Sequence, residues 1–396
     1  MERAARGLLA VVVVLACAPA QAGQATSAER ATRGALYLAG RQAATGAFFS
    51  ADAPADSVAE ALAVVAAAPV GDAPVRAALG YIAEHGARRS AERAAYAARI
   101  TLGLISAGRD PRAFHGDHVE QVTRRYDQIK GTYDDGLYSN ALAVLALSAA
   151  DEQIPERVLT MFETNVCRDG GFGHEEACVT GADTDTTAMV AMAVTAWKGA
   201  SAGVVRGARA WLRDNQLAGG GWGARPGDAV NANSTGLAVS AIVAIGEDPV
   251  GATWRARDGS PMDAVASLQL PSGAFRYLAS DERANDYATV QAVPALARRA
   301  YPVKPWKSAR VTTSERTQGV SEARHDISTE PARADGTQPS DGSSGRAATT
   351  ASGLAIGSSA TPNEPTPPRA PVPLAMVMLL LSGGLLVWRI TWSGAR

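Results

Sequence analysis

The chain has 396 residues, of which 46% are hydrophobic and 19% are charged, and its formal net charge is −1. A balance so close to neutral gives no reason to expect nucleic acid as a partner. The composition changes along the chain, and the changes separate two terminal segments and a polar linker from one region long enough to form a sizeable domain.

Residues 1–22 have the pattern of a secretory signal peptide. Arg3 and Arg6 precede an apolar run over residues 8–16, and Ala20 and Ala22 form a small-residue cleavage site. Cleavage after Ala22 is therefore expected. The residues ending at Cys17 also match part of a lipoprotein signal, so a lipid on Cys17 is the alternative. Both patterns predict export.

A short motif recurs between residues 25 and 301. Three copies share the spacing Q-x-x-x-G-[AG]-[FW], at 42–48, 216–222 and 269–275, and a fourth at 166–172 has Val in place of Gln. Each copy joins an amphipathic stretch, typical of a helix touching solvent, to an apolar stretch typical of a buried helix. Weaker copies at 72–107 and 119–150 complete six helical hairpins, about 40 to 50 residues apart. The pattern predicts an all-α domain, and periodicity alone allows a closed ring or an open solenoid.

This repeat resembles that of the squalene cyclase and prenyltransferase superfamily, whose domains are α/α toroids. The resemblance implies that the six hairpins close into a ring with the apolar helices inside. Because these inner helices would run parallel, the polar residues at their starts would gather at one mouth of the ring, where they suit N-caps and a ligand site. The candidate ligand-binding residues are Tyr138, Asn140, Asp183, Asp185, Asn231, Asn233, Ser234 and Asp286.

Residues 183–188 also resemble a damaged form of the D-x-D-D-T-A acid motif of squalene–hopene cyclases, with Thr186 in place of the third Asp. Carbocation chemistry needs a strong acid in a dry, aromatic-lined cavity, and aromatic residues make up only 6% of the chain. We therefore expect Asp185 to cap a helix and face a ligand, and we assign no catalytic residue.

A second resemblance is to the cobalamin carriers, the intrinsic factor and transcobalamin family. Segments 184–193, 231–238 and 288–296 follow the carrier pattern in the same order, and Tyr301 matches a closing Tyr. The resemblance implies that Asp185 and Asn231 hydrogen-bond the amides of a corrinoid, which would be held without a covalent bond. Asn233 stands where the family has Tyr, and the carriers' smaller β-rich domain is absent.

The remaining predictions concern two cysteines and the C-terminal segments of the chain. Cys167 and Cys178 flank a short loop, and export predicts that they form a disulfide; too few ligands accompany them for a metal site. Residues 302–371, rich in Ser, Thr, Pro and Gly, predict a disordered stalk. Residues 372–392 predict a single transmembrane anchor, and the basic residues near its end predict a cytoplasmic C-terminus.

The combined hypothesis is a binding protein anchored at the cell surface. Its first ligand candidate is cobalamin or another corrinoid, as part of an uptake system that includes a transporter or a second binding protein in place of the missing domain. The alternatives are a protein-binding or adhesive toroid, a terpene-cyclase-like enzyme, and a carbohydrate-active α/α enzyme that pairs Glu175 or Glu176 with Asp183 or Asp185.

Overall fold

A computed structural model describes residues 25–306. The predicted signal peptide and membrane anchor, and all of the predicted stalk beyond residue 306, lie outside these residues. The described part contains twelve α-helices, two short 3-10 turns (Glu176–Cys178 and Ala252–Trp254) and isolated β-bridges, and it contains no strand. None of its helices is long and apolar enough to cross a membrane. The prediction of an all-α domain is confirmed.

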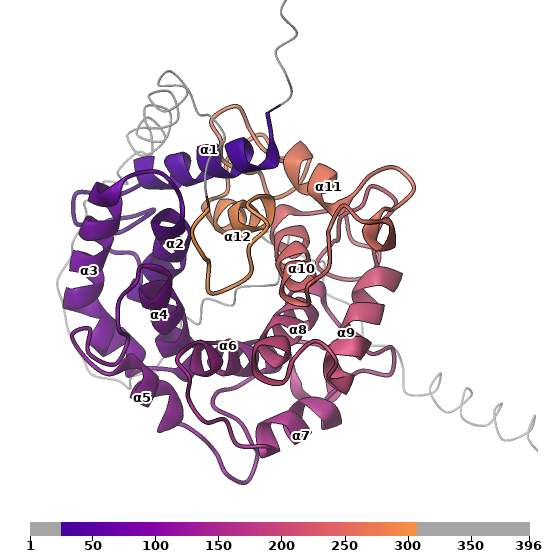
Figure 1. Cartoon of the computed structure of the whole chain (residues 1–396), viewed down its shortest axis with the longest axis horizontal. Helices are drawn as coiled ribbons and strands as arrows, with labels where there is room; N and C mark the ends of the chain where they lie inside the picture. Colours follow the sequence, from indigo (N-terminus) through magenta and orange to yellow (C-terminus); the bar gives the residue numbers. More distant parts are fainter. Residues whose placement is uncertain (1–24, 307–396) are drawn as a thin grey trace, which may run out of the picture. The chain divides into compact units, whose positions relative to one another are not determined.

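The helices alternate between an outer and an inner layer around a common axis (Figure 1). The outer helices are α1 (Ser27–Gly40), α3 (Asp72–Ser90), α5 (His118–Thr123), α7 (Arg157–Thr164), α9 (Gly203–Asp214) and α11 (Pro261–Ser267). The inner helices are α2 (Ala55–Ala67), α4 (Ala94–Ser106), α6 (Leu137–Ala149), α8 (Thr184–Lys198), α10 (Ala232–Ala244) and α12 (Asp286–Leu296). Each inner helix contacts the next, and α12 contacts α2, so the six hairpins form a closed toroid.

The glutamine of the repeat motif ties successive hairpins together. Nε2 of Gln216 donates to the carbonyl of Gly220 in its own motif, at 2.7 Å, and to that of Trp254 in the next hairpin, at 2.8 Å. Gln269 makes the equivalent outward bond to the carbonyl of Arg30, at 2.8 Å. Because Arg30 belongs to α1, the last motif joins the two ends of the domain and closes the ring.

The motif glycine is required by its backbone conformation and its neighbours. Gly220 has φ +90°, and a Cβ at this position would lie 2.5 Å from the backbone of Ser260. An L side chain is disfavoured at this φ. The close contact places the motif loop directly against the start of the next outer helix.

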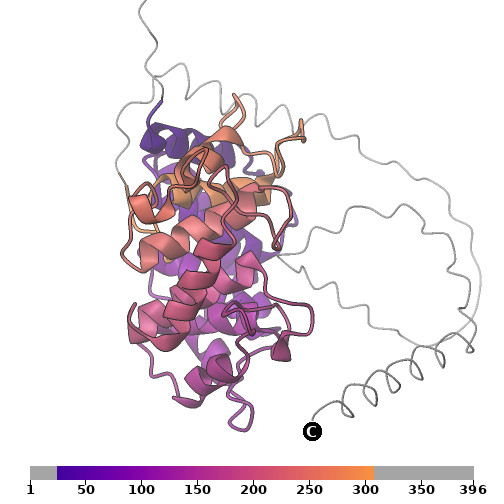
Figure 2. The same cartoon turned by 90° about the vertical axis from the view of Figure 1, so that its right-hand side faces the viewer.

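In three of the four motif copies, a threonine in the first turn of the inner helix fixes the motif to its own hairpin. The hydroxyl oxygens of Thr187, Thr235 and Thr289 accept the backbone N–H of the motif aromatics Phe172, Trp222 and Phe275, at 2.9, 3.1 and 2.9 Å. These loops lie where the outer helices end and the inner helices begin, so they line one mouth of the ring. The side view shows the connecting loops along the edges of the toroid (Figure 2).

The inner helices are buried on nearly all sides, which their alanine-rich sequences allow. On α10, for example, a Cβ at Gly236 would meet the carbonyl oxygen of Gln291 on α12 at 2.5 Å. Small residues thus permit close approach between neighbouring inner helices, and Val, Leu and Met fill the remaining space. Burial of this apolar surface is the main stabilising contribution to the ring.

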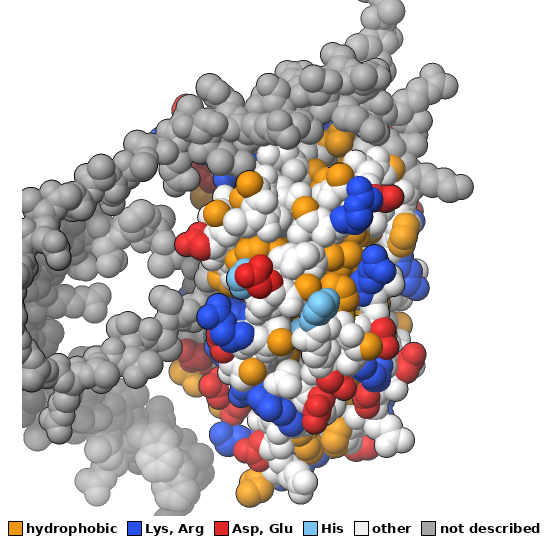
Figure 3. Space-filling model, turned by 90° about the vertical axis from the view of Figure 1, so that its left-hand side faces the viewer, with side chains coloured by type: hydrophobic (Ala, Val, Ile, Leu, Met, Phe, Trp, Pro, Cys, Tyr) orange, Lys and Arg blue, Asp and Glu red, His pale blue; other side chains and the backbone are white. Residues whose placement is uncertain are grey.

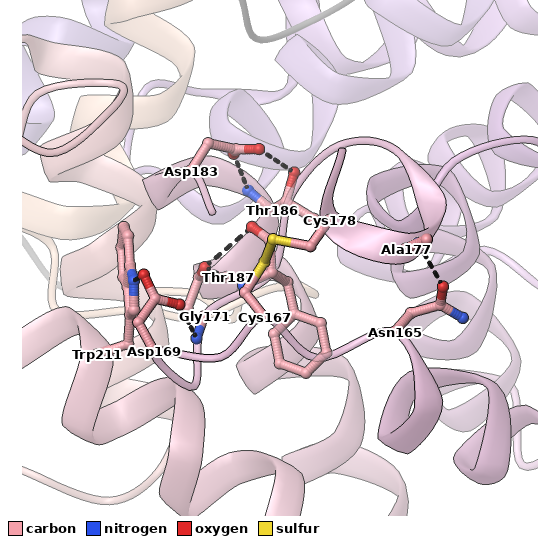
Figure 4. The surroundings of a disulfide bond; sticks show 11 residues. Asn165, Cys167, Asp169, Gly171, Ala177, Cys178, Asp183, Thr186, Thr187 and Trp211 are labelled. Carbon is pink, nitrogen blue, oxygen red and sulfur yellow. Dashed lines mark hydrogen bonds between the residues drawn. A yellow bond between two sulfur atoms is a disulfide. The ribbon is translucent and has the colours of Figure 1, made fainter. Parts of the chain in front are cut away.

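The disulfide prediction is confirmed. Cys167 and Cys178 are joined, with their Cα atoms 5.5 Å apart, in the loop between α7 and α8 (Figure 4). Within this loop the carbonyl of His174 accepts the N–H of Leu137, the first residue of α6, at 3.0 Å. The cross-linked loop therefore helps to hold the start of a neighbouring inner helix.

The segment after α12 crosses the opposite mouth. The N–H of Val303 donates to the Ser106 hydroxyl, and the N–H of Trp306 donates to the Ala67 carbonyl, each at 3.1 Å. Ser106 ends α4 and Ala67 ends α2. Residues 297–306 therefore lie across the mouth formed by the C-terminal ends of the inner helices, and among the described residues the mouth at their N-terminal ends is the better place for a ligand.

Candidate functional site

Two layers of side chains line the ring near this N-terminal mouth. The second residues of the six inner helices form what we call the rim layer: Asp56, Ala95, Tyr138, Asp185, Asn233 and Tyr287. Four residues further along each helix, on the same face, lies the inner layer: Glu60, Arg99, Leu142, Met189, Leu237 and Gln291. These two layers, identified from the first residue of each inner helix, are the candidate site.

The N-terminal ends of three inner helices are capped by side chains. Asp183 accepts the N–H of Thr186, Asn231 that of Ser234 and Asn285 that of Ala288, at 2.7, 2.8 and 2.8 Å. The expectation that Asp185 caps its helix is wrong, because Asp183 occupies the N-cap position and Asp185 lies inside the first turn of α8. Asp185 is therefore available for another interaction.

Asp185 is a buried carboxyl with an unpaired oxygen. Its relative exposure is 5%, and its Oδ1 has no hydrogen-bond partner among the described residues. Burial raises the pKa of Asp185 to about 7, which the neighbouring Asp183 reinforces and the Ser234 hydroxyl opposes. At neutral pH this group can therefore either donate or accept a hydrogen bond.

Asn233 occupies the equivalent rim position on the next helix, α10. It is half-buried, and its Oδ1 is also buried without a hydrogen-bond partner in the described part of the chain. The Asp185 side chain lies against Ser234, the residue after Asn233. Two unpaired oxygens thus lie on adjacent helices at the same depth of the mouth.

The other predicted ligand residues have different surroundings. Tyr138 lies in the rim layer and lines the central cavity, and burial raises its pKa well above the usual value. Asn140 is fully buried and binds the loop before α6 through Tyr133, Asp134 and Gly136. Asp286 pairs with Arg41, the residue that follows α1, at 3.1 Å.

Asn231 and Ser234 bind each other. In addition to the cap, Asn231 Nδ2 donates to the Ser234 hydroxyl at 3.1 Å, and both residues are buried. Asp183 has both carboxylate oxygens bonded to Thr186 (Figure 4). Of the predicted residues, Asp185, Asn233 and Tyr138 share the rim layer.

A buried ionic network occupies the opposite side of the ring. Asp56 accepts Arg89 Nε at 2.6 Å and Arg99 Nη1 at 3.0 Å. Glu60 Oε2 lies 3.9 Å from Arg99 Nε, and burial raises the pKa of Glu60, although Arg99 opposes the shift. Because the network joins α2, α3 and α4, its clear role is to hold these helices together.

The cavity enclosed by the inner layer is small. It has a volume of ≈ 20 Å³ and is lined on one side by Glu60 and Arg99, on the other by Leu142, Met189 and Leu237, and by Tyr301 from the C-terminal segment. This volume is enough for about one water molecule, whereas sites for small organic ligands typically measure roughly 300 to 1,000 Å³. A larger ligand would have to bind at the rim.

Glu60 and Arg99 belong to no sequence motif, and Gln291 lies in the carrier-like segment 288–296 but was not predicted to line the site. Their shared position becomes visible only when the first residue of each inner helix is known, because the layers are defined by counting from that residue. Among residues 25–306 there is no group of three His, Cys, Asp or Glu side chains placed to hold a metal ion. On the face that carries α3, side chains of both charge signs are interspersed with apolar ones (Figure 3).

No family model matches the chain, and no curated protein matches it in sequence. A protein from Actinoplanes has a similar solved structure, with a TM-score of 0.52 and 14% identity over 69% of this chain and 99% of that chain. The type II terpene cyclase MstE from Scytonema gives 0.49 and 12% over 68% and 97%. The ent-copalyl diphosphate synthase from Streptomyces platensis gives 0.44 and 18% over 61% and 50%.

At these identities a structural likeness shows the fold and says nothing of the reaction or the ligand. The likeness to the Actinoplanes protein shows a shared fold, and the closed ring of six helical hairpins is the α/α toroid that the resemblance of the repeat motif implied. Its function has to be argued from the rim and inner layers themselves.

Proposed function

We propose that the toroid is a binding protein that holds a small ligand at the rim layer, with cobalamin or another corrinoid as the first candidate. The observation that carries this proposal is the pair of buried, unpaired oxygens, Oδ1 of Asp185 and Oδ1 of Asn233. A buried polar atom without a partner typically costs about 1 to 3 kcal/mol. A bound ligand that supplies N–H donors would remove that cost.

The chemistry of a corrinoid suits this pair. Its flat macrocycle is fringed with amide side arms, and amide N–H groups are the donors that the two oxygens lack. The carrier resemblance supports the same assignment, because it relates Asp185 to a position that hydrogen-bonds these amides. Asn231 is committed to capping α10, so Asn233 is the better candidate for a direct contact on that helix.

The small cavity supports binding at the rim. With ≈ 20 Å³ available in the ring, a macrocycle has to lie across the mouth, where part of it remains open to a partner. In this proposal the exported and anchored protein presents the ligand to a transporter or to a second binding protein. The same exposed mouth would serve a protein-binding toroid, but buried unpaired oxygens favour a ligand that can reach them.

The test is a calorimetric titration of cyanocobalamin into the full-length protein and its variants. Removing one partner from a buried contact should weaken binding roughly 5- to 150-fold, so Asp185→Ala and Asn233→Ala should each lose affinity within that range. Asp214→Asn, at the exposed end of α9, is the matched control and should bind like the wild type. Absence of heat and of retained cobalamin with the wild type up to millimolar ligand would reject the proposal in favour of a protein-binding toroid.

A second candidate, a terpene-cyclase-like enzyme, is favoured by the protonation of the same carboxyl. A pKa of about 7 keeps a large fraction of Asp185 protonated at neutral pH, as an acid catalyst requires, and the residue lies in the segment that resembles the cyclase acid motif. The ring would have to open a much larger chamber for a prenyl chain. Incubation with geranylgeranyl dihydroxybenzoate, the substrate seen in a variant of the Scytonema cyclase, should then give a cyclised product that Asp185→Asn abolishes.

A further inference from the structure

A strained turn lies beside the rim layer in the first hairpin. The N–H of Ser50 donates to the carbonyl of Phe48 at 2.9 Å, so Phe49 is the central residue of a γ-turn, and its φ is +74°. The γ-turn with positive φ is rare and strained, and positive φ is exceptional for a bulky side chain.

The turn is a departure from the repeat. The residues that follow the motif aromatic in the other conserved copies are Gly173, Gly223 and Arg276, and none of them has a positive φ. Hairpin geometry therefore does not require this conformation. Strained residues of this kind cluster at ligand clamps and active sites.

The turn places the Phe49 ring on a rim residue. The ring centroids of Phe49 and Tyr287 are 5.8 Å apart, at an interplanar angle of 43°. Both residues are half-buried, so part of the aromatic surface remains accessible. The Tyr287 hydroxyl lies at the Ser57 side chain, which fixes the ring at the start of α2.

This aromatic pair adjoins the unpaired oxygens. Tyr287 is the second residue of α12, which contacts α10, and α10 carries Asn233 and contacts α8 with Asp185. Around the mouth, the aromatic pair is therefore followed by the Asn233 amide and then by the Asp185 carboxyl. Such an arc suits a ligand that has a flat apolar face on one side and amide donors on the other.

We propose that Phe49 and Tyr287 form an aromatic platform that determines ligand specificity by holding the flat part of the ligand, while Asn233 and Asp185 accept its amide donors. The platform rests on the proposed binding function and adds the requirement for a planar ring system. The alternative is that the Phe49 ring only packs over the first hairpin.

Phe49→Gly separates the two roles, because glycine relieves the positive φ while it removes the ring. If the ring serves the ligand, the melting temperature of the variant should be unchanged or higher, and its affinity for cyanocobalamin should fall roughly 3- to 15-fold. Phe49→Leu, which keeps bulk without an aromatic face, should lose affinity by a similar factor. His115→Gly, at an exposed residue with φ +54° beyond the end of α4, is the matched control and should keep wild-type affinity.

Each of the three other outcomes would reject the platform. Equal affinities of the wild type, Phe49→Gly and Phe49→Leu would overturn the platform and leave the proposed binding function standing. A lower melting temperature of Phe49→Gly, together with wild-type affinity of Phe49→Leu, would make the ring a packing residue. A wild type that binds no cyanocobalamin would reject the proposed function and the platform with it.

Discussion

The carboxylate of Asp183 accepts both the backbone N–H of Thr186, at 2.7 Å, and its hydroxyl, at 2.9 Å. This double contact makes Asp183 the N-cap of α8. The residue that it binds, Thr186, stands in place of the third Asp of the cyclase motif. The next acidic residue, Asp185, takes no part in capping. The two carboxyls, two residues apart, can therefore be tested separately.

Asp183→Ala should destabilise the fold by about 1 kcal/mol, because the variant loses the cap of a central inner helix. Asp183→Asn retains an acceptor and should stay close to the wild type. Urea denaturation followed by circular dichroism measures both. Equal midpoints for the wild type and the alanine variant would contradict the assignment of the cap.

Asp185 should make the stability depend on pH in the direction opposite to that of an ion-paired carboxylate. Its pKa rises from 3.8 to about 7 on folding, so between these values the folded state binds more protons than the unfolded state. Stability should therefore fall as pH rises from about 4 to about 7, by up to about 4 kcal/mol, and change no further above that range.

Asp185→Asn removes this titration and supplies the control. The variant should gain stability relative to the wild type as pH rises from 5 to 8, in urea denaturation at each pH. A constant difference between the two proteins over this range would show that the folded and unfolded states bind the Asp185 proton equally well.

The motif glycines should tolerate no side chain. Gly220→Ala should lose roughly 1 to 3 kcal/mol for its positive φ, and more for a Cβ placed 2.5 Å from the backbone of Ser260. Gly219→Ala is the matched control, since a Cβ there meets nothing within 4 Å. Thermal unfolding of both variants measures the difference, and similar melting temperatures would contradict the close approach.

The fold was largely predictable because the repeat motif encodes it directly. The spacing of Gln216 and Gly220 is visible in the sequence, and each residue makes a contact that links two successive hairpins. The end-to-end closure through Gln269 and Arg30 needed the family resemblance, since an open solenoid has the same periodicity.

The site was only partly predictable, for two physical reasons. Asp183 and Asp185 are both good caps by residue type, and only the backbone decides which of them lies at the N-cap, because helix starts are uncertain by one or two residues from sequence. Phe49 carries no signal at all, because its positive φ contradicts the preference of its residue type.

The disulfide should stabilise the domain measurably. Cross-linking residues 11 apart should contribute about 3 kcal/mol in the chain-entropy model. The Cys167→Ser/Cys178→Ser double variant should therefore unfold at a lower urea concentration than the oxidised wild type. The reduced wild type is the control and should match the double variant, and an oxidised protein no more stable than the double variant would contradict the expectation.

The pH dependence of ligand binding should distinguish the proposed binding protein from the terpene-cyclase-like enzyme. An amide donor binds better to the carboxylate form of Asp185, so a ligand bound in this way lowers the pKa of that group and its dissociation constant decreases as pH rises through about 7. An acid catalyst acts in its protonated form, so cyclisation would slow over the same range.

Calorimetric titration of cyanocobalamin at pH 6, 7 and 8 should show tighter binding at each step, and Asp185→Asn should bind with an affinity independent of pH. Wild-type binding that weakens as pH rises would mean that Asp185 donates its proton to the ligand, and product formation that declines above pH 7 would support the enzyme.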